Sequence, residues 1–219
     1  CEIAKENKER SKKLTNSIYG RSKIEQNKAL CGLRKRDIEE INTIKYITNK
    51  DNIEAYNELI KYGNDFSDKT SMGYYICGTT GTGKSLLVKR LVTMILNKGY
   101  SVLFITSADL IANIKKRMSE PEIRDLKRYA EYVDLLVVDD LGVERGTEWE
   151  IGELFEIFNH RWTMSKPIIF TSNLSLNEIK KKYDSYGRIY SRILGSTNKV
   201  FVINGIDNRI EHFKNRAKK

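Results

Sequence analysis

The sequence predicts an α/β protein built on a doubly wound, parallel sheet of five strands. Short apolar runs of strand length alternate with longer stretches of helical periodicity. This alternation indicates parallel strands joined by right-handed helical crossovers. Residues 135–138 are four apolar residues in a row, which is typical of a strand that helices cover on both faces. A glycine-rich segment, 78–85, separates the first apolar run from the helical stretch that follows it.

The apolar runs and the breaks between them give the bounds of the expected elements. The expected strands are 74–77, 101–106, 135–138, 167–172 and 199–203. The expected helices are 51–61, 84–97, 109–118, 121–132, 149–164, 177–182 and 188–194. The first 36 residues are strongly charged and their apolar positions are sparse. We therefore expect residues 1–50 to form a charged, mostly helical appendage or linker, outside the core of a domain that spans 51–219.

Composition limits the classes of partner and compartment. The chain has 219 residues, of which 39 are basic and 29 acidic, and its net charge is +10. This excess favours a polyanionic partner, nucleic acid before membrane, although a merely soluble basic surface stays open. No apolar run approaches the length of a membrane span, so no membrane partner is expected. Three scattered cysteines are too few for a disulfide framework, which favours a reducing cytoplasm.

The glycine-rich segment has the spacing of a P-loop, with a strand before it and a helix after it. Its glycines allow successive N–H groups to face one phosphate, and the helix N-terminus adds partial positive charge. Lys84 would reach the β- and γ-phosphates, and the Ser85 hydroxyl would ligate Mg²⁺. The alternative is a glycine-rich turn that carries Lys-Ser by chance. The expected nucleotide-binding residues are Gly78, Thr79, Thr80, Gly81, Thr82, Gly83, Lys84, Ser85 and Leu86.

Polar side chains end the two later buried strands. Asp139 and Asp140 follow the run at 135–138, and an acid at this end of a parallel strand faces the phosphate site. Asp139 is the expected Mg²⁺ ligand, whereas Asp140 would orient or deprotonate the attacking water. Asn173 follows the next strand and could hold that water or a γ-phosphate oxygen, because an amide both donates and accepts. Taken alone, Asn173 is more typical of a turn.

Two arginines fall on one face of the expected helix 188–194. Arg188 and Arg192 are four positions apart, which places them side by side on a helix. An arginine supplied across a subunit boundary would neutralise charge on a γ-phosphate. The residues alone favour a solvated basic face.

Four segments in this order and spacing, GTTGTGKS, LLVVDDLGVE, IIFTSN and RIYSRI, resemble the AAA+ ATPases of the DnaC/DnaI helicase-loader family. Relatives of that family include the IstB transposition ATPases and the initiator DnaA. The resemblance covers roughly residues 70–210 and implies an AAA+ core of the P-loop NTPase fold. The chain ends soon after the last expected strand, which leaves no room for the helical lid domain that many AAA+ proteins carry.

The resemblance also implies roles for single residues. It gives Walker A as Lys84 and Ser85, Walker B as Asp139 and Asp140, and sensor 1 as Asn173. In the same family Arg192 corresponds to the arginine finger, Arg188 to its companion, and Arg209 to a sensor 2 candidate. Many AAA+ proteins have glutamate where Asp140 stands, so we expect slow hydrolysis.

An inserted helix in relatives of the initiator and loader type lies after the second strand and faces a central channel. By that resemblance, Lys115, Lys116 and Arg117 are candidates to contact the phosphates of single-stranded DNA. No base-reading pattern is visible. A solvated basic face is the alternative.

Together these features predict a cytoplasmic, Mg²⁺-dependent ATPase that loads a replicative helicase onto single-stranded DNA. ATP would control its self-association, with Arg192 of one subunit reaching the nucleotide of the next. One alternative is an IstB-like transposition helper, which shares every motif. Another is a P-loop nucleotide kinase, for which the sequence shows no acceptor pocket. A binding protein with a decayed ATPase is disfavoured by the intact Lys84, Ser85, Asp139 and Asp140.

Overall fold

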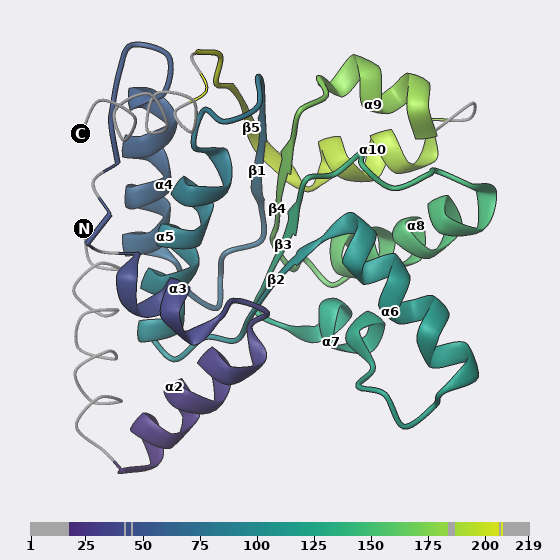
Figure 1. The fold of residues 1–219 in the computed structure, drawn as a ribbon, viewed down its shortest axis with the longest axis horizontal. Helices are drawn as coiled ribbons and strands as arrows, with labels where there is room; N and C mark the ends of the chain where they lie inside the picture. The colour runs from purple at the N-terminus through teal and green to yellow at the C-terminus, as the bar shows by residue number, and fades with distance from the viewer. Residues whose placement is uncertain (1–17, 42, 45, 184–186, 206, 208–219) are drawn as a thin grey trace, which may run out of the picture.

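The computed structural model describes residues 18–41, 43, 44, 46–183, 187–205 and 207. Its centre is a parallel five-stranded sheet in the order β2-β3-β4-β1-β5 (Figure 1). The strands are β1 (Gly73–Cys77), β2 (Val102–Thr106), β3 (Leu135–Asp139), β4 (Ile168–Ser172) and β5 (Thr197–Val202). The predicted fold class is therefore confirmed. Each expected strand is present with its bounds shifted by one or two residues, most at the start of β5.

Helices cover both faces of this sheet (Figure 1). On one face lie α2 (Ile18–Leu30), α3 (Lys35–Glu40), α4 (Ile53–Asp65) and α5 (Lys84–Asn97). On the other face lie α6 (Ser107–Ser119), α7 (Leu126–Tyr132), α8 (Glu148–Thr163), α9 (Leu176–Tyr183) and α10 (Arg188–Gly195). Because successive strand residues point to opposite faces, Tyr74 and Ile76 enter one core while Tyr75 and Cys77 enter the other. Every residue of β1, β3 and β4 is buried, as their apolar runs predict.

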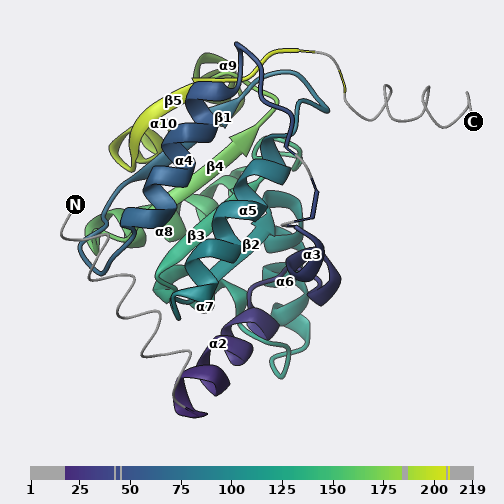
Figure 2. The same cartoon turned by 90° about the vertical axis from the view of Figure 1, so that its left-hand side faces the viewer.

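The described part of the predicted appendage packs on the core, which corrects the expectation that it lies outside. Ile24, Cys31, Ile38 and Ile41 are all buried, and α2 and α3 lie on the same side of the sheet as α4 and α5 (Figure 2). The Cys31 carbonyl accepts a hydrogen bond of 2.7 Å from the backbone N–H of Phe104 in β2. Ile24 and Ile38 lie within α2 and α3, whereas Cys31 and Ile41 directly follow these helices. The domain boundary near residue 50 stays a prediction.

None of the helices that the structure describes is both long and apolar enough to cross a bilayer. Residues 203–205 and 207, the described part of the chain beyond β5, form no helix.

One buried arginine joins the elements on the α8 face. Arg161 of α8 has no exposed surface. Its guanidinium donates to the carbonyl oxygens of Ala130 at 2.7 Å, Val133 at 2.9 Å and Pro167 at 2.8 Å. Burial lowers its pKa to about 9, so the group remains charged at neutral pH. The side chain thus holds the end of α7 and the segments that lead into β3 and β4 at fixed positions.

Replacing this arginine should cost more stability than replacing any exposed one. Arg161→Ala leaves several buried carbonyls without donors and opens a cavity, so we expect the free energy of unfolding to fall by about 3–5 kcal/mol. Chemical denaturation measures this loss. The matched control is Arg145→Ala at an exposed position, which should stay within about 0.5 kcal/mol of the parent. Equal unfolding midpoints for the two variants would contradict the role of Arg161.

Candidate nucleotide-binding site

The loop between β1 and α5 depends on glycines that adopt left-handed backbone angles. The φ angles of Gly78, Gly81 and Gly83 are 127°, 77° and 92°, in a region that side chains other than glycine rarely occupy. A Cβ atom on Gly78 would also lie 2.1 Å from the carbonyl oxygen of Ile203. The loop therefore combines an unusual backbone with close contact to a distant segment.

That segment comprises residues 203–205 and 207, which follow β5 and lie beside the loop. Its backbone N–H at Ile203 donates to the Cys77 carbonyl at 2.7 Å. The Thr79 hydroxyl lies 3.2 Å from the Gly205 carbonyl oxygen and 3.1 Å from the Gly205 nitrogen. A Cβ on Gly81 would lie 1.9 Å from an Asp207 carboxylate oxygen. Arg209, the sensor 2 candidate, lies outside the described residues.

The buried Lys84 links the loop to the end of β4. Its ammonium donates to the carbonyl oxygens of Gly78 and Thr79, both at 2.8 Å, and to Oδ1 of Asn173 at 2.9 Å. Lys84 and Asn173 are 89 positions apart in the sequence, and both were predicted to act on the γ-phosphate. Of the other loop residues, Thr80 is exposed, whereas Leu86 packs partly on the core.

The two predicted magnesium ligands also meet. The Ser85 hydroxyl donates to Oδ1 of Asp139 at 2.9 Å, and the Thr171 hydroxyl donates to the same oxygen. Burial raises the pKa of Asp139 above its ordinary value, although these two hydrogen bonds oppose the shift. A hydroxyl and a carboxylate are oxygen ligands of the kind that Mg²⁺ prefers. The pair therefore fits the expected metal, for which Asp139 and Ser85 would be the protein ligands.

Asp140 has a strained backbone beside this pair. Its φ angle is 51°, and a non-glycine residue in this region costs about 1–3 kcal/mol. The Asp140 N–H donates to the Thr171 hydroxyl at 3.0 Å, and the Leu141 N–H donates to the Thr171 carbonyl at 2.8 Å. In the part of the chain that the structure describes, nothing donates to the Asp140 carboxylate. Surrounding contacts thus fix its backbone and leave its acidic group available.

Sequence reasoning missed Thr171 and Ser172 as members of the site. Thr171 holds both Asp139 and Asp140, and the Ser172 hydroxyl donates to the Leu141 carbonyl at 2.5 Å. Both residues are fully buried. The signal was present in the sequence, because two hydroxyl residues end an otherwise apolar strand directly before Asn173.

Tyr46 was also missed, because it falls within the predicted appendage. Its ring lies against the loop, 3.2 Å from where a Cβ of Gly83 would be, and stacks on the Tyr56 ring at a centroid distance of 5.4 Å. Burial raises the pKa of Tyr46 to about 12. Its hydroxyl is buried, and no described group forms a hydrogen bond with it. Arg90 of α5 donates to the Ile44 carbonyl at 2.6 Å and so holds this segment beside the loop.

The two candidate finger arginines lie on α10, on the opposite face of the sheet from α5 (Figure 1). Arg192 donates through Nε to Oδ1 of Asn159 at 2.7 Å, and its guanidinium lies 4.3 Å from the ring centre of Trp162. Arg188 and Arg192 line an open hollow of about 410 Å³ together with Phe155. None of the residues that line this hollow belongs to the P-loop.

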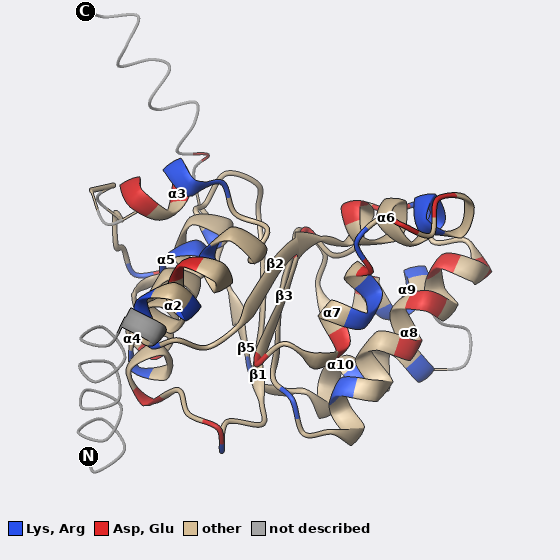
Figure 3. Ribbon diagram, turned by 90° about the horizontal axis from the view of Figure 1, so that it is seen from below, with Lys and Arg blue, Asp and Glu red and all other residues tan. Residues whose placement is uncertain are grey.

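Each of the three candidate DNA-binding cations pairs with an acidic group. Figure 3 shows basic and acidic residues side by side on α6 and its neighbours. The ammonium–carboxylate distances are 2.7 Å for Lys115 and Glu150 and 3.7 Å for Lys116 and Glu120, and Arg117 lies 3.3 Å from Asp125. The cluster is therefore largely neutralised within the chain.

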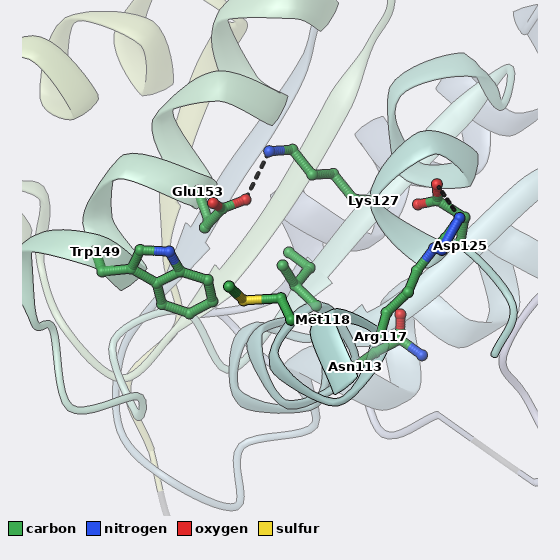
Figure 4. A pocket seen from close by; sticks show the side chains of 8 residues that line it. Asn113, Arg117, Met118, Asp125, Lys127, Trp149 and Glu153 are labelled. Carbon is green, nitrogen blue, oxygen red and sulfur yellow. Dashed lines mark hydrogen bonds and ion pairs between the residues drawn. The ribbon is translucent and has the colours of Figure 1, made fainter. Parts of the chain in front are cut away.

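The same region contains a pocket of about 290 Å³ between α6, α7 and α8 (Figure 4). Ile114, Met118 and Trp149 supply its apolar lining, and Lys127 pairs with Glu153 at 2.6 Å across it. Lys115 also lies 5.4 Å from the ring centre of Trp149. An aromatic ring thus lies close to two lysines, but each lysine already pairs with a glutamate of α8.

A phosphate-binding loop beside an acidic strand end places the molecule among the P-loop ATPases. Comparison with known sequences gives the family. The model for the IstB-like ATP-binding proteins matches residues 64–204, and the chain belongs to that family.

Individual relatives are named for DNA replication. The chain is 24% identical over 134 residues to the replicative helicase loader DnaI of Bacillus subtilis, covering 61% of this chain and 40% of that protein. It is 29% identical over 131 residues to the replicative helicase loader DnaC of Escherichia coli K12, covering 59% and 53%. The chain therefore spans about half the length of these relatives or less. A crystal structure of the DnaC helicase loader superimposes with a TM-score of 0.66 at 23% identity, covering 78% of this chain and 99% of that one. This likeness establishes the fold.

Removing the Thr171 hydroxyl, which donates a hydrogen bond to the Asp139 carboxylate, should weaken Mg²⁺ binding. Thr171→Val keeps the buried shape but loses a hydrogen bond to a charged group, worth about 1.5–3 kcal/mol, so we expect about tenfold weaker affinity for the Mg²⁺–ATP complex. Asp139 must be deprotonated to ligate a cation, and losing the bond raises its pKa further. Binding should therefore fail at higher pH than in the parent. Titrations with fluorescent ATP and Mg²⁺ across a pH series measure both effects.

The control for this variant is Thr93→Val. Thr93 is a buried threonine of α5 whose hydroxyl donates to the Lys89 carbonyl at 3.1 Å. It should change stability without shifting the pH dependence. If the two variants bind Mg²⁺–ATP equally well, Thr171 does not support the metal site.

Proposed function

We propose that this chain is a Mg²⁺-dependent ATPase that loads a replicative helicase onto single-stranded DNA in the cytoplasm. The observation that carries the ATPase part is the convergence of Lys84 with Asn173 and of Ser85 with Asp139 at one end of the sheet. The loader part is supported by the names of the two relatives, which match over 134 and 131 residues. As part of the proposal, residues 51–219 form the ATPase domain, and the described part of residues 1–50 packs against it.

The contacts of the site suggest how each side chain acts. On ATP binding, the Lys84 ammonium would exchange its two loop carbonyls for β- and γ-phosphate oxygens while it keeps Asn173 nearby. Backbone N–H groups at the start of α5 would receive the remaining phosphate charge. Ser85 and Asp139 would hold Mg²⁺, which when bound would neutralise charge on the phosphates. The carboxylate of Asp140 would accept the proton of the attacking water as the bond to the γ-phosphorus forms, and ADP leaves.

Two alternatives to the helicase-loader function predict different partners or substrates. An IstB-like transposition helper would use the same ATPase site but would bind a transposase, and the family match supports this alternative as well. A P-loop nucleotide kinase would transfer the γ-phosphate to a small acceptor. No loop residue lines the pockets at α6–α8, at α7 or at the α8–α10 hollow, so none of these three would serve as its acceptor site.

Loading of a helicase tests the main proposal. We expect the parent chain with ATP to increase strand displacement by the replicative helicase of the same organism on a protein-coated single-stranded circle. Lys84→Ala should lose this effect because its site cannot hold phosphate. Asp140→Asn should bind ATP and the helicase but turn over slowly. Binding to a transposase together with no effect on the helicase would favour the transposition alternative.

We propose further that Arg192 acts on the nucleotide of a neighbouring subunit. Asn159 and Trp162 hold its guanidinium at the protein surface, on the other face of the sheet from its own P-loop. A cation kept there can stabilise the transition state only when two subunits meet. ATP turnover per subunit should therefore rise with protein concentration.

Mixing two inactive variants tests this arrangement. Arg192→Ala should bind ATP yet lose hydrolysis, and Lys84→Ala has a dead site with an intact finger. Together they should recover part of the parent activity through mixed interfaces, because an intact site then faces an intact arginine. Arg188→Ala should have a milder effect. Failure to recover activity, despite co-assembly shown by sedimentation, would argue against a finger at Arg192.

Single-stranded DNA is the second proposed partner, with Lys115, Lys116 and Arg117 as contacts. Because each of them already pairs with an acidic group, DNA phosphates would replace carboxylates rather than solvent. We therefore expect modest, sequence-independent affinity, with less salt dependence than three free cations would give.

A further inference from the structure

Glu144 is a buried carboxylate in the loop that follows the Walker B residues. Its exposed fraction is 5%. One oxygen, Oε2, accepts hydrogen bonds from the Ser107 hydroxyl and from the Gly142 N–H, the latter at 3.3 Å. The other oxygen, Oε1, is buried, and no donor among the described residues reaches it. A buried acid with only one oxygen in use calls for an explanation.

Through Ser107, the Glu144 carboxylate is bonded to a different element, the helix α6. It is fully buried and is the first residue of α6. Its hydroxyl also lies 3.1 Å from the backbone carbonyl of Asp140. Since a hydroxyl carries one proton, Ser107 shares it between the Glu144 carboxylate and this carbonyl. The beginning of α6 is therefore bonded to both ends of the segment 140–144.

The segment 140–144 contains the left-handed backbone of Asp140, which persists only if its surroundings determine it. Thr171 of β4 holds this turn from one side through the Asp140 N–H. Ser107 and Glu144 hold it from the other side, through the Asp140 carbonyl and the Gly142 N–H. Without them, β4 would supply the turn's only hydrogen bonds to another element among the described residues.

We propose that Glu144 is a positioning residue for ATP hydrolysis: through Ser107 and Gly142 it fixes the Walker B turn to α6 and so sets the orientation of Asp140. What matters is the length of its side chain, which places one acceptor oxygen within hydrogen-bond distance of Ser107 and Gly142, and not its charge, because only Oε2 accepts hydrogen bonds from the described residues. Any partner that shifts α6 would thereby also shift Asp140. This inference rests on the proposed role of Asp140 in hydrolysis.

Two substitutions of Glu144 separate the effect of side-chain length from the effect of charge. Glu144→Gln keeps the length and one acceptor oxygen but removes the charge. Glu144→Asp keeps the charge but is one methylene shorter, too short to serve Ser107 and Gly142 together. We expect Glu144→Gln to hydrolyse ATP within about threefold of the parent, and Glu144→Asp to lower kcat by about tenfold or more with unchanged ATP affinity. Nucleotide titrations and steady-state turnover measure the two quantities.

Amide hydrogen exchange provides a readout that does not need activity. In Glu144→Asp, peptides that cover 140–146 and the first turn of α6 should exchange several-fold faster, whereas the P-loop peptide should not change. Ser107→Ala, which removes the same joint from the other side, should give the same pattern. Asp134→Asn is the matched control: it changes a partly buried carboxylate before β3 that accepts hydrogen bonds from the Ser101 N–H and hydroxyl, away from the segment 140–146 and from α6, and it should leave both peptides unaffected.

The outcomes distinguish this inference from the proposed function. If the parent does not hydrolyse ATP, the proposed function fails, but the exchange pattern still decides whether Glu144 holds the turn. If Glu144→Asp keeps full turnover and Glu144→Gln loses it, the charge of Glu144 matters and the positioning role is wrong. Parent-like exchange in both Glu144→Asp and Ser107→Ala would overturn it as well.

Discussion

The carboxylate of Asp139 is buried between hydroxyl groups from two other elements, and the rest of the site depends on that convergence. Ser85 reaches it from α5 and Thr171 from β4. A buried carboxylate without such donors would protonate or disrupt its surroundings. The convergence requires β4 to lie between β1 and β3, as it does in this sheet. Strand order, and not the motifs alone, therefore brings the metal ligands together.

The fold and the main site residues were predictable because their signals are local. Buried parallel strands are continuous apolar runs, and the loop before α5 requires glycine and Lys-Ser at fixed spacing. The position of α2 and α3 was not predictable in the same way. Their apolar residues are few, and whether Ile24 and Ile38 are buried depends on the surface that α5 and β2 offer to them.

The site residues that sequence analysis missed or misjudged are those whose roles depend on contacts with residues distant in the sequence. Thr171 resembles any strand threonine until Asp139 lies beside it, and Glu144 is one charged loop residue among several. Lys115 looked like part of a free basic cluster, yet its partner Glu150 is 35 positions away and begins a different helix. Such pairings decide whether a charge faces solvent, the core or a ligand, and no local pattern records them.

The segment after β5 packs so closely against the P-loop that each restricts which side chains the other can carry. The space that side chains on Gly78 and Gly81 would occupy is filled by the Ile203 carbonyl and the Asp207 carboxylate. Thr79 and Gly205, 126 positions apart, bond across the same contact. Tolerance to substitution in the loop is therefore set jointly by phosphate geometry and by the segment that follows β5. Mutational change at these two places is coupled, so neither can vary freely while the other stays fixed.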